Sequence, residues 1–313
     1  MQIYRDTQSA LPQSSKGRSI AIGIFDGVHL GHQALVEGAM SCADVDGLSS
    51  AILTFEPHPA KVLAPDYAPK MLEPLSRRLE RFEKLGVDEV FIQPFTLDFA
   101  RRSPEDFIEK TLVGQLRVRH VTVGEGFVFG AKQAGDVTLL KKMGESLGFA
   151  THPVNHVRQT GMVTSSSKVR EFIRNGQIKG ATLLLGREPE IFGSVVPGAG
   201  RGTGLGFGTA NLSCENELLP ATGVYAICAR TKAGNFEGVL NVGYTPTFGS
   251  ETEIKVEAHL FDYSGDDLYG ETIYLELVDY IRTERKFDGP ESLKAQIGQD
   301  IEAAKAALKE RSS

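Results

Sequence analysis

The most informative chemical groups in this sequence are two histidines that follow a short apolar run and frame a glycine. The run from Ser19 to Phe25 is ended by Asp-Gly, and His29, Gly31 and His32 come next. The apolar run predicts a buried strand, and the residues from Gly31 onward predict a helix. A helix N-terminus carries free N–H groups and a partial positive charge, so this turn favours a phosphate, with His29 and His32 as hydrogen-bond donors.

Two other interpretations of the histidines stay open. They can be surface histidines beside a turn, which is what a single histidine in such a place usually is. They can also bind zinc, but His-x-x-His supplies only two ligands and no cysteine is close by in the sequence. The glutamate of a His-Glu-x-x-His protease helix is missing as well, so the pattern favours the phosphate over the metal.

A second group of hydroxyls and cations follows in the sequence Thr-Ser-Ser-Ser-Lys-Val-Arg, residues 164–170. Hydroxyls at a helix start can cap the helix or bind phosphate oxygens, and Arg170 can hold a phosphate through two parallel hydrogen bonds. Taken alone, the segment fits a well-capped surface helix at least as well. We interpret this segment as a phosphate site only because it occurs together with the histidine turn.

The second half contains a glycine-rich stretch that precedes a Thr-Ala-Asn sequence. Residues 193–207 include six glycines, and Thr209 and Asn211 follow. Successive backbone N–H groups of such a loop can form a cradle for an anion, and the oxygens of Thr209 and Asn211 suit Mg²⁺. A flexible linker is the alternative, although Thr-Ala-Asn is unlike a plain spacer. The glycines expected to contribute are Gly200, Gly202 and Gly204.

Glu257 is the candidate base of this second site. It lies in a predicted strand, where alternation places it on one face with Lys255 and His259. A carboxylate there can accept the proton of a hydroxyl that attacks a γ-phosphate. A solvated strand face explains the same pattern, and the residues alone leave both interpretations open.

The elements that must position these groups change in character along the chain. The first half alternates short apolar runs with helical periods, which predicts parallel βαβ units with helices on both faces of the sheet. From about Gly186, several β-rich runs follow without helices between them, which predicts a small antiparallel barrel or sandwich. A last helix is expected over Pro290–Lys309. The residues expected on its apolar face are Leu293, Ile297, Ile301 and Ala304.

Length and composition agree with two domains, which we place at residues 1–185 and 186–313. The 313 residues are 41% hydrophobic and 24% charged, as in ordinary globular proteins. A net charge of −6 argues against a nucleic-acid partner bound through a basic surface. Three cysteines without a Cys-x-x-Cys pair, a polar N-terminus and no long apolar run predict a cytoplasmic protein without a membrane partner.

Together these motifs resemble the bacterial bifunctional riboflavin kinase/FAD synthetase family over nearly the whole chain. The first half contains GIFDGVHLGH (23–32), TFEPHP (54–59), VGEGFVFG (123–130) and SSSKVR (165–170) in the family's order. The second half contains LLPATGVYA (218–226), NVGYTPTF (241–248), VEAHLFD (256–262), DLYG (267–270) and IRTERKF (281–287). The resemblance implies an α/β, Rossmann-like nucleotidyltransferase domain with a parallel sheet, followed by a small antiparallel Greek-key β-barrel with a C-terminal helix.

The resemblance also implies an activity and its site residues. Riboflavin would be phosphorylated by ATP to FMN and ADP, and FMN would be adenylylated by ATP to FAD and pyrophosphate, with Mg²⁺ as cofactor. Thr209 and Asn211 would contact Mg²⁺–ATP, and Glu257 would be the base for the riboflavin 5′-hydroxyl. The other ATP and phosphate contacts implied are Gly23, Phe25, His29, Gly31, His32, Ser166, Ser167 and Arg170. The flavin contacts implied are Phe55, Pro57, Gly126, Phe127, Phe129 and Arg282.

Among the substitutions that depart from the family pattern, three put an activity in question. Gly126 stands where an acid or amide is usual, Val128 where arginine is frequent, and Gly208 where the family has proline before Thr209. The first two fall on the loop expected to receive the flavin. Two alternatives therefore stay open: only one of the two activities is retained, or the chain is a degenerate regulator that binds flavin nucleotides.

Overall fold

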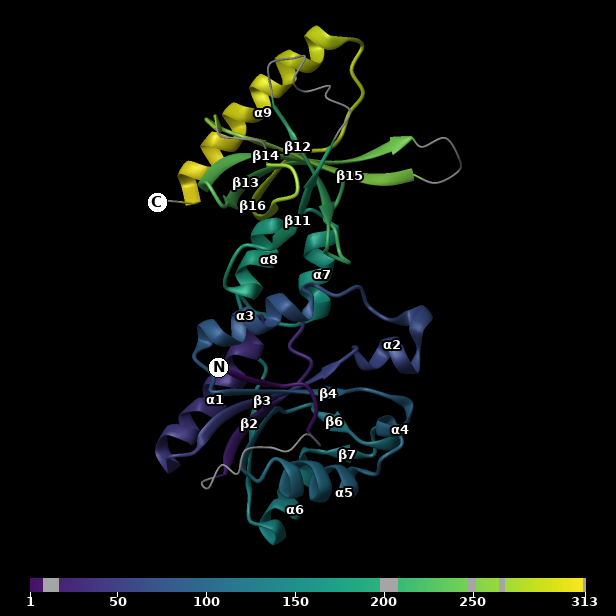
Figure 1. Ribbon diagram of the computed structural model, residues 1–313, viewed down its shortest axis with the longest axis vertical. Coiled ribbons are helices and arrows are strands. Elements are labelled where there is room, and N and C mark those ends of the chain that lie inside the picture. The colour runs from purple at the N-terminus through teal and green to yellow at the C-terminus, as the bar shows by residue number, and fades with distance from the viewer. Residues whose placement is uncertain (8–16, 198–207, 247–251, 265–267, 312–313) are drawn as a thin grey trace. The chain divides into compact units, whose positions relative to one another are not determined.

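The computed structural model describes residues 1–7, 17–197, 208–246, 252–264 and 268–311. The chain divides into two compact units, Met1–Ser165 and Ser166–Ser313, and Figure 1 labels many of their elements. Among the residues of these ranges, no helix is both long and apolar enough to cross a membrane. The compact units divide at a different residue from the expected functional domains, and the functional boundary at 185/186 stays a prediction.

The first unit is built on a six-stranded parallel sheet with the order β1–β4–β3–β2–β5–β8. Ala21 of β2 is in register with Ile52 of β3 on one side and with Thr122 of β5 on the other. The strand order reverses at β2, and ligands of parallel sheets usually bind outside the carboxyl ends of the strands at such a point. In sheet order the strands are Gln2–Tyr4, Glu89–Pro94, Ser49–Glu56, Arg18–Ile22, Val118–Gly124 and Ala150–Val154.

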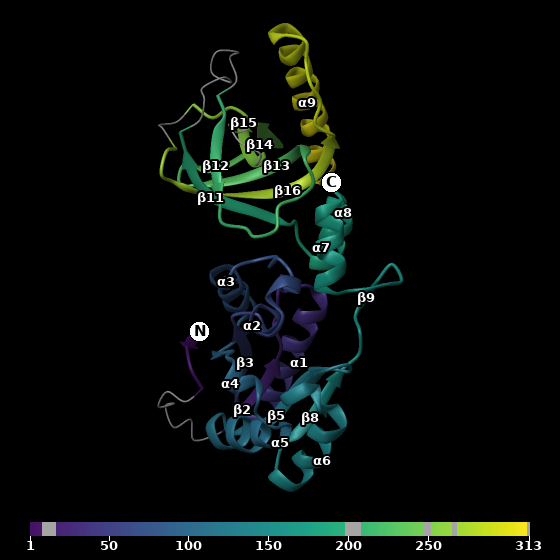
Figure 2. The same ribbon diagram turned by 90° about the vertical axis from the view of Figure 1, so that its right-hand side faces the viewer.

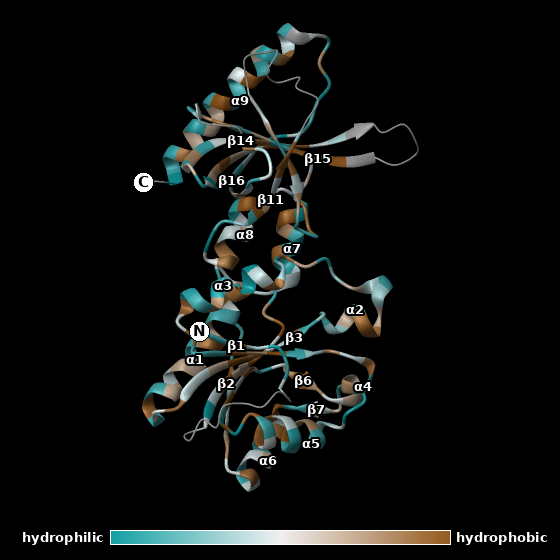
Figure 3. Ribbon diagram, in the orientation of Figure 1, coloured by the Kyte–Doolittle hydropathy of each residue, from teal (hydrophilic) through white to brown (hydrophobic). Residues whose placement is uncertain are grey.

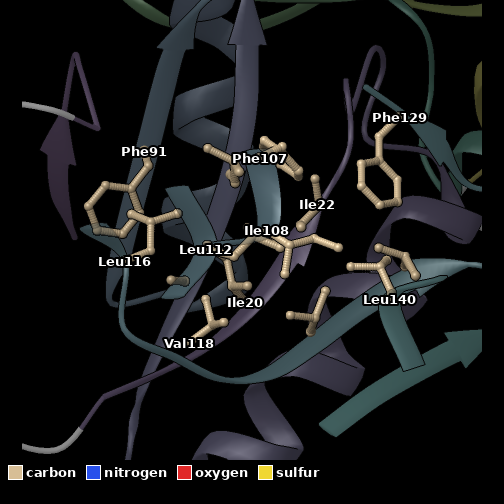
Figure 4. Packing of buried hydrophobic residues seen from close by; sticks show 14 of the residues in the cluster. Ile20, Ile22, Phe91, Phe107, Ile108, Leu112, Leu116, Val118, Phe129 and Leu140 are labelled. Carbon is tan, nitrogen blue, oxygen red and sulfur yellow. The ribbon is translucent and has the colours of Figure 1, made fainter. Parts of the chain in front are cut away.

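Helices cover both faces of this sheet, as the alternating pattern predicts. On one face Val36 and Phe82 are buried with Ile52 and Val90 of the strands. The other face carries the larger core, in which Ile108 of a π-helix packs among strand residues (Figure 4). Burial of apolar surface in both layers stabilises the unit. The helices are α1 (Leu30–Asp46) and α3 (Leu75–Leu85) on the first face, and α6 (Val137–Leu147) and the π-helix η2 (Phe107–Gln115) on the second.

Shorter elements connect these layers. Ser103 caps the short helix Pro104–Asp106, because its Oγ accepts a hydrogen bond from the Asp106 N–H at 3.1 Å. The short elements are α2 (Pro59–Leu63), η1 (Pro65–Tyr67), α4 (Leu97–Ala100), α5 (Pro104–Asp106), β6 (Val128–Phe129), η3 (Ala131–Gln133), β7 (Gly135–Asp136), β9 (Arg158–Gln159) and β10 (Met162–Val163).

The second unit is a closed antiparallel barrel with the strand order β11–β12–β15–β14–β13–β16. Closure comes from pairing of β11 with β16, so the described sheet has no open edge. Figure 3 shows hydrophobic positions along these strands. The strands are Glu190–Val196, Ala210–Cys214, Gly223–Thr231, Gly234–Pro246, Thr252–Leu260 and Thr272–Arg282, in chain order. The helices of this unit are α7 (Ser166–Arg174), α8 (Ile178–Leu185) and α9 (Pro290–Arg311).

Alternation along the barrel strands separates an inner core from an outer face. Leu212 and Val256 point into the barrel core, whereas Ala226 and Val239 belong to a second cluster with Ala304 of α9. The predicted barrel with a C-terminal helix is therefore confirmed. The residues next to Leu212 and Val256 along their strands face away from the core, and among them are candidate site residues.

Some local predictions were wrong. The strand expected to reach Phe25 ends at Ile22, because Phe25 has a φ of 55° that a strand cannot contain. Strand β11 was not expected, although it includes Gly193 at the start of the glycine-rich stretch. A Cβ on Gly193 would lie 2.1 Å from the Ser213 carbonyl oxygen, so the glycine here serves close pairing with β12.

The buried face of α9 also differs from the expected one. Gln296, Asp300, Ala304 and Leu308 are its most buried residues, whereas Ile297 is only half-buried. Two of these buried residues, Gln296 and Asp300, are polar. A prediction from apolar residues alone therefore misplaced the middle of the buried helix face. Asp300 is buried because it pairs with an arginine of the barrel, as described below.

Candidate active sites

The turn after β2 lies at the carboxyl end of the strand where the sheet order reverses. Three of its residues have left-handed backbone conformations, with φ of 55° at Phe25, 79° at Gly27 and 38° at Val28. These angles turn the chain sharply before α1 begins. His29 is the N-cap of α1, with φ −69° and ψ 169°. The free N–H groups of the first helical turn therefore point toward this edge of the sheet.

His29 and His32 lie against each other at the start of α1. Their ring centroids are 3.6 Å apart with an interplanar angle of 15°. The backbone N–H of His32 donates to His29 Nδ1 at 3.2 Å, and His29 is only 5% exposed. Because Nδ1 accepts a hydrogen bond, the proton of the neutral His29 ring is on Nε2. His29 is thus oriented as a donor without any ligand being needed to hold it.

Gly31 packs closely against the His29 ring. A Cβ at position 31 would lie 3.1 Å from His29 Cε1 and 3.2 Å from its Nδ1. A larger residue at this position would need the His29 ring to shift by a few tenths of an ångström. The glycine therefore leaves room for the histidine in the orientation described above.

Two buried charged residues hold the turn from behind. Asp26 is 2% exposed and accepts hydrogen bonds from the backbone N–H groups of Leu72 at 3.0 Å and Glu73 at 3.3 Å. The guanidinium of Arg78, on α3, donates to the Ile24 carbonyl at 2.8 Å and pairs with Glu56. The sequence pattern assigns Asp26 only to a turn, and a charged residue directly after a buried strand is the signal for its anchoring role.

A cavity of about 720 Å³ opens beside this turn, and aromatic rings form a large part of its wall. Phe55, Phe127 and Phe129 line it, and Gly23 borders it at the end of β2. Of the other described residues predicted to contact the flavin, Pro57 and Gly126 do not line this cavity. A hollow of this volume with flat aromatic walls suits a planar ring system.

Sequence reasoning missed half of the aromatic wall. Phe95, Phe99 and Phe107 also line the cavity, and Phe99 contacts both Phe55 and Phe95 with ring centroids 5.9 and 5.7 Å apart. Two cations, Arg102 and Lys132, lie at the same cavity. The available signal was three phenylalanines in thirteen residues after a strand, but no motif distinguishes them from core residues.

The predicted pyrophosphate contacts lie on α7, which belongs to the second compact unit. Arg170 is buried, Ser166 is half-buried and Ser167 is exposed. Lys168 forms an ion pair with Glu171 at 2.8 Å on the same helix. The helix start predicted here is confirmed, and the approach of these residues to the histidines stays a prediction.

The candidate site of the barrel is a row of polar residues across three strands. Glu257 of β15 is in register with Asn211 of β12 on one side and with Asn241 of β14 on the other. Residues directly opposite one another share a face of the sheet. Sequence reasoning identified Asn211 and Glu257 but did not assign a role to Asn241, because only the strand pairing brings it beside them.

Asn211 fits a metal ligand by its surroundings. It is 8% exposed, and its Oδ1 is buried without a hydrogen-bond partner among the described residues. A buried carbonyl oxygen without a partner is costly, and a cation would satisfy it. Thr209 is exposed two residues earlier, so both residues can supply neutral oxygens to Mg²⁺.

Neighbouring polar residues fix the rest of this face. Lys255 Nζ lies 2.7 Å from Glu257 Oε1, which agrees with the predicted shared face of these residues. A ring nitrogen of His259, Nδ1, lies 2.8 Å from the Gly208 carbonyl oxygen and ties the start of β12 to β15. The predicted anion cradle of Gly200, Gly202 and Gly204 lies outside the described residues.

Arg282, predicted to contact the flavin, is held by α9. Its Nε and Nη2 donate to the two carboxylate oxygens of Asp300 at 2.8 and 2.7 Å, and Gln296 donates to the same carboxylate at 2.7 Å. The Arg282 guanidinium also lies 5.7 Å from the centre of the Phe287 ring. The paired geometry orients the guanidinium at the end of β16, and its role toward a flavin stays a prediction.

Comparison with known proteins identifies the family. The FAD synthetase family matches residues 11–168, and the riboflavin kinase family matches residues 185–308. A Haemophilus influenzae protein named bifunctional riboflavin kinase/FMN adenylyltransferase is 36% identical over 307 residues, 98% of this chain and 99% of that protein. This chain belongs to that family. A Bacillus subtilis member of the same name is 36% identical over 289 residues, 91% of this chain and 90% of that protein.

A solved structure shares the fold. A Streptococcus pneumoniae protein described as a macrolide-efflux protein matches with a TM-score of 0.87 and 28% sequence identity, over 97% of this chain and 98% of that one. Its description differs from the names of the family members above, and the likeness bears on the fold. The family and fold class predicted from the motifs are confirmed, whereas the roles of individual residues stay predictions.

Proposed function

We propose that this chain makes FAD from riboflavin in two ATP-dependent steps, each carried out at its own site. The observation that carries the proposal is the presence of both family matches, in order, on one chain. The barrel would phosphorylate riboflavin to FMN with release of ADP. The parallel-sheet unit would adenylylate FMN to FAD with release of pyrophosphate.

In adenylyl transfer, an FMN phosphate oxygen attacks the α-phosphorus of ATP and the bond to pyrophosphate breaks. The chemistry depends on alignment and on neutralising charge, without a covalent enzyme intermediate. His29, with its proton on Nε2, and the N-terminal N–H groups of α1 would donate to the phosphate oxygens. The aromatic cavity beside the turn would hold the isoalloxazine ring. Ser166, Ser167 and Arg170 would hold the departing pyrophosphate.

In the kinase step, the riboflavin 5′-hydroxyl attacks the γ-phosphorus of ATP. Glu257 would accept the hydroxyl proton, and Lys255, which pairs with that carboxylate, would hold it in place. Thr209 and Asn211 would hold Mg²⁺, which neutralises charge on the phosphates when it is bound. The unpartnered Oδ1 of Asn211 supports this assignment.

Partners and compartment follow from the same proposal. Riboflavin, FMN, FAD and ATP are the ligands, with ADP and pyrophosphate as products. The net charge of −6 supports a protein without a nucleic-acid partner. We place the protein in the cytoplasm without a membrane partner, in keeping with a biosynthetic enzyme that uses cellular ATP.

The test is to incubate the purified full chain with MgATP and either riboflavin or FMN, and to separate the flavins by chromatography. FAD should form from both starting flavins, with FMN as an intermediate from riboflavin. Unchanged riboflavin would remove the kinase half of the proposal, and accumulation at FMN would remove the transferase half. Tight flavin binding with neither product would support the regulator instead.

A further inference from the structure

A cluster of metal-ligating side chains lies in the first unit at the far end of α1 from the phosphate-binding turn. Cys42 and Asp46 are one turn apart near the C-terminus of α1, and His120 and His152 belong to β5 and β8. Cys42 is twelve residues beyond the first residue of α1, roughly 18 Å along the helix axis. The cluster is therefore separate from the nucleotide site of this unit.

The sheet register brings the two histidines together on the face that α1 covers. His120 is in register with Ala150 and Thr122 with His152, so the histidines are diagonal neighbours on one face of adjacent strands. A Cβ on Gly38 of α1 would lie 3.3 Å from Thr122 Cγ2, which shows how closely the helix covers this face. Figure 2 labels α1, β5 and β8 in this unit.

The donor atoms of the cluster are close enough to share one ion. His120 Nδ1 lies 2.9 Å from His152 Nε2, and Cys42 Sγ and one nitrogen of each histidine all lie within 4.8 Å of one another. Bond lengths to tetrahedral zinc place two nitrogen ligands about 3.3 Å apart and a nitrogen and a sulfur about 3.6 Å apart. Small side-chain rotations are enough to reach these separations.

Asp46 gives the cluster a feature that a chance grouping lacks. Its Oδ2 lies 2.7 Å from His120 Nε2, which places the proton of the neutral His120 ring on Nε2 and turns the Nδ1 lone pair toward His152. A carboxylate that holds the outer nitrogen of a histidine is the usual support of a metal-bound imidazole. The hydrogen bonds from Asp46 through His120 to His152 do not involve a thiol, yet the Cys42 thiol lies within 4.8 Å of a nitrogen of each histidine.

We propose that Cys42, His120 and His152 form a binding site for a zinc-class transition metal ion, with Asp46 as the residue that orients His120. Two imidazoles and a thiolate favour zinc or a similar borderline ion, whereas Mg²⁺ prefers oxygen ligands such as those of Thr209 and Asn211. A water molecule would supply the fourth ligand of a tetrahedral ion.

The protonation balance of binding is simple. Burial, together with the Asp46 carboxylate, raises the pKa of the Cys42 thiol, so metal binding must release that proton. Binding through Nε2 of His152 moves its ring proton to Nδ1, and His120 keeps its proton on Nε2. One proton is released for each metal ion, and the bound ion ties α1 to β5 and β8.

Cobalt(II) is the probe, because its visible spectrum reports geometry and its near-ultraviolet band reports a cobalt–thiolate bond. The full chain should bind one equivalent with a tetrahedral spectrum and a thiolate band, and Zn²⁺ should displace it. Cys42→Ser should abolish the thiolate band, and Asp46→Asn should weaken affinity about 10–100-fold. Cys228→Ser, a matched control in the barrel, should keep both the thiolate band and the wild-type affinity for the metal. Absence of stoichiometric binding, or a band that survives Cys42→Ser, would overturn the proposal.

A measurement on the wild-type chain guards against a variant that does not fold. One equivalent of Zn²⁺ should slow the alkylation of Cys42 by iodoacetamide, while the alkylation rate of Cys228 stays unchanged. Peptide mass spectrometry measures both rates. The same concentration of Mg²⁺ should protect neither cysteine. Equal rates at Cys42 with and without Zn²⁺ would contradict a metal–thiolate bond, whatever happens in either catalytic step.

Discussion

The two candidate active sites differ in how much of each is held in place by the protein itself. In the parallel-sheet unit, His29 is fixed by a backbone hydrogen bond and by the His32 ring, and Asp26 and Arg78 hold the turn. In the barrel, Asn211 Oδ1 has no partner among the described residues. The first site is preorganised by its own fold, whereas the second leaves an oxygen for a ligand to satisfy. Because of this difference, we expect substitution of a site residue to change the free energy of unfolding differently in the two units.

The largest effect should come from the base of the barrel site. Glu257→Gln removes the proton acceptor, and we expect the kcat for FMN formation to fall about 10²–10⁴-fold. FAD formation from added FMN should stay unchanged, because that step belongs to the other unit. Glu237→Gln, an exposed glutamate on β14, is the control. Loss of both steps with Glu257→Gln would mean that the sites do not divide the work.

The reverse pattern is expected at the histidine turn. His29→Ala removes a positioned donor to phosphate, and we expect FAD formation from FMN to fall about 10²–10³-fold. FMN formation from riboflavin should be spared. His156→Ala, an exposed histidine of the same unit, should leave both rates unchanged. An unaltered FAD rate in His29→Ala would remove this histidine from the chemistry.

Stability should change in opposite directions at the two sites. His29→Ala removes the N-cap hydrogen bond of α1 and should lower the free energy of unfolding of the first unit by about 1 kcal/mol. Asn211→Leu removes an unpartnered acceptor, so it should recover part of the roughly 1–3 kcal/mol that such a group costs. The barrel variant should nevertheless lose kinase activity.

Hydrogen exchange, followed peptide by peptide along a urea series, separates the two units in this measurement. A drop in stability of the barrel with Asn211→Leu would show that its amide oxygen is already satisfied. An unchanged first unit with His29→Ala would show that the contact to His32 N–H contributes little. Either outcome would mean that the two sites differ less in preorganisation than the contacts of His29 and Asn211 indicate.

The smallest effect is expected at the aromatic cavity. Phe127→Leu keeps an apolar wall but removes one flat ring, and we expect the KM for FMN to rise about 2–10-fold, the equivalent of one aromatic contact. The KM for riboflavin should not change. Phe236→Leu, in the barrel, is the matched substitution and should leave the KM for FMN as it is. An unchanged KM in Phe127→Leu would place the flavin elsewhere.

Local motifs carried most of what the sequence could predict. The histidine turn was predictable because strand end, turn, N-cap and helix start are consecutive residues, so His29, Gly31 and His32 meet through local geometry alone. The alternating layers of the first unit were predictable from periodicity, whereas for the second unit periodicity left a barrel and a sandwich both open. Family resemblance added the roles, which periodicity does not contain.

Contacts between distant segments could not be predicted in this way. Phe55, Phe99 and Phe129 meet in one cavity only after three separate segments fold together. Asn241 reaches Glu257 through strand pairing, and Cys42 reaches two histidines through helix packing on the sheet. Buried polar residues were missed for the same reason, since a pattern of apolar residues gives no sign of an Asp that a distant Arg will pair with.

The pairing of Arg282 with Asp300 has a consequence for work on the C-terminus. The Nε and Nη2 groups of the guanidinium donate to a carboxylate of the last helix, and its Nη1 group donates to the Thr283 carbonyl oxygen. A flavin that binds this arginine therefore has to compete with contacts that the chain already makes. Truncating the chain before Asp300 would leave an uncompensated cation at the end of β16. Shortened or tagged versions of the C-terminus are therefore changes to the kinase unit, and activity measured on them would describe an altered enzyme.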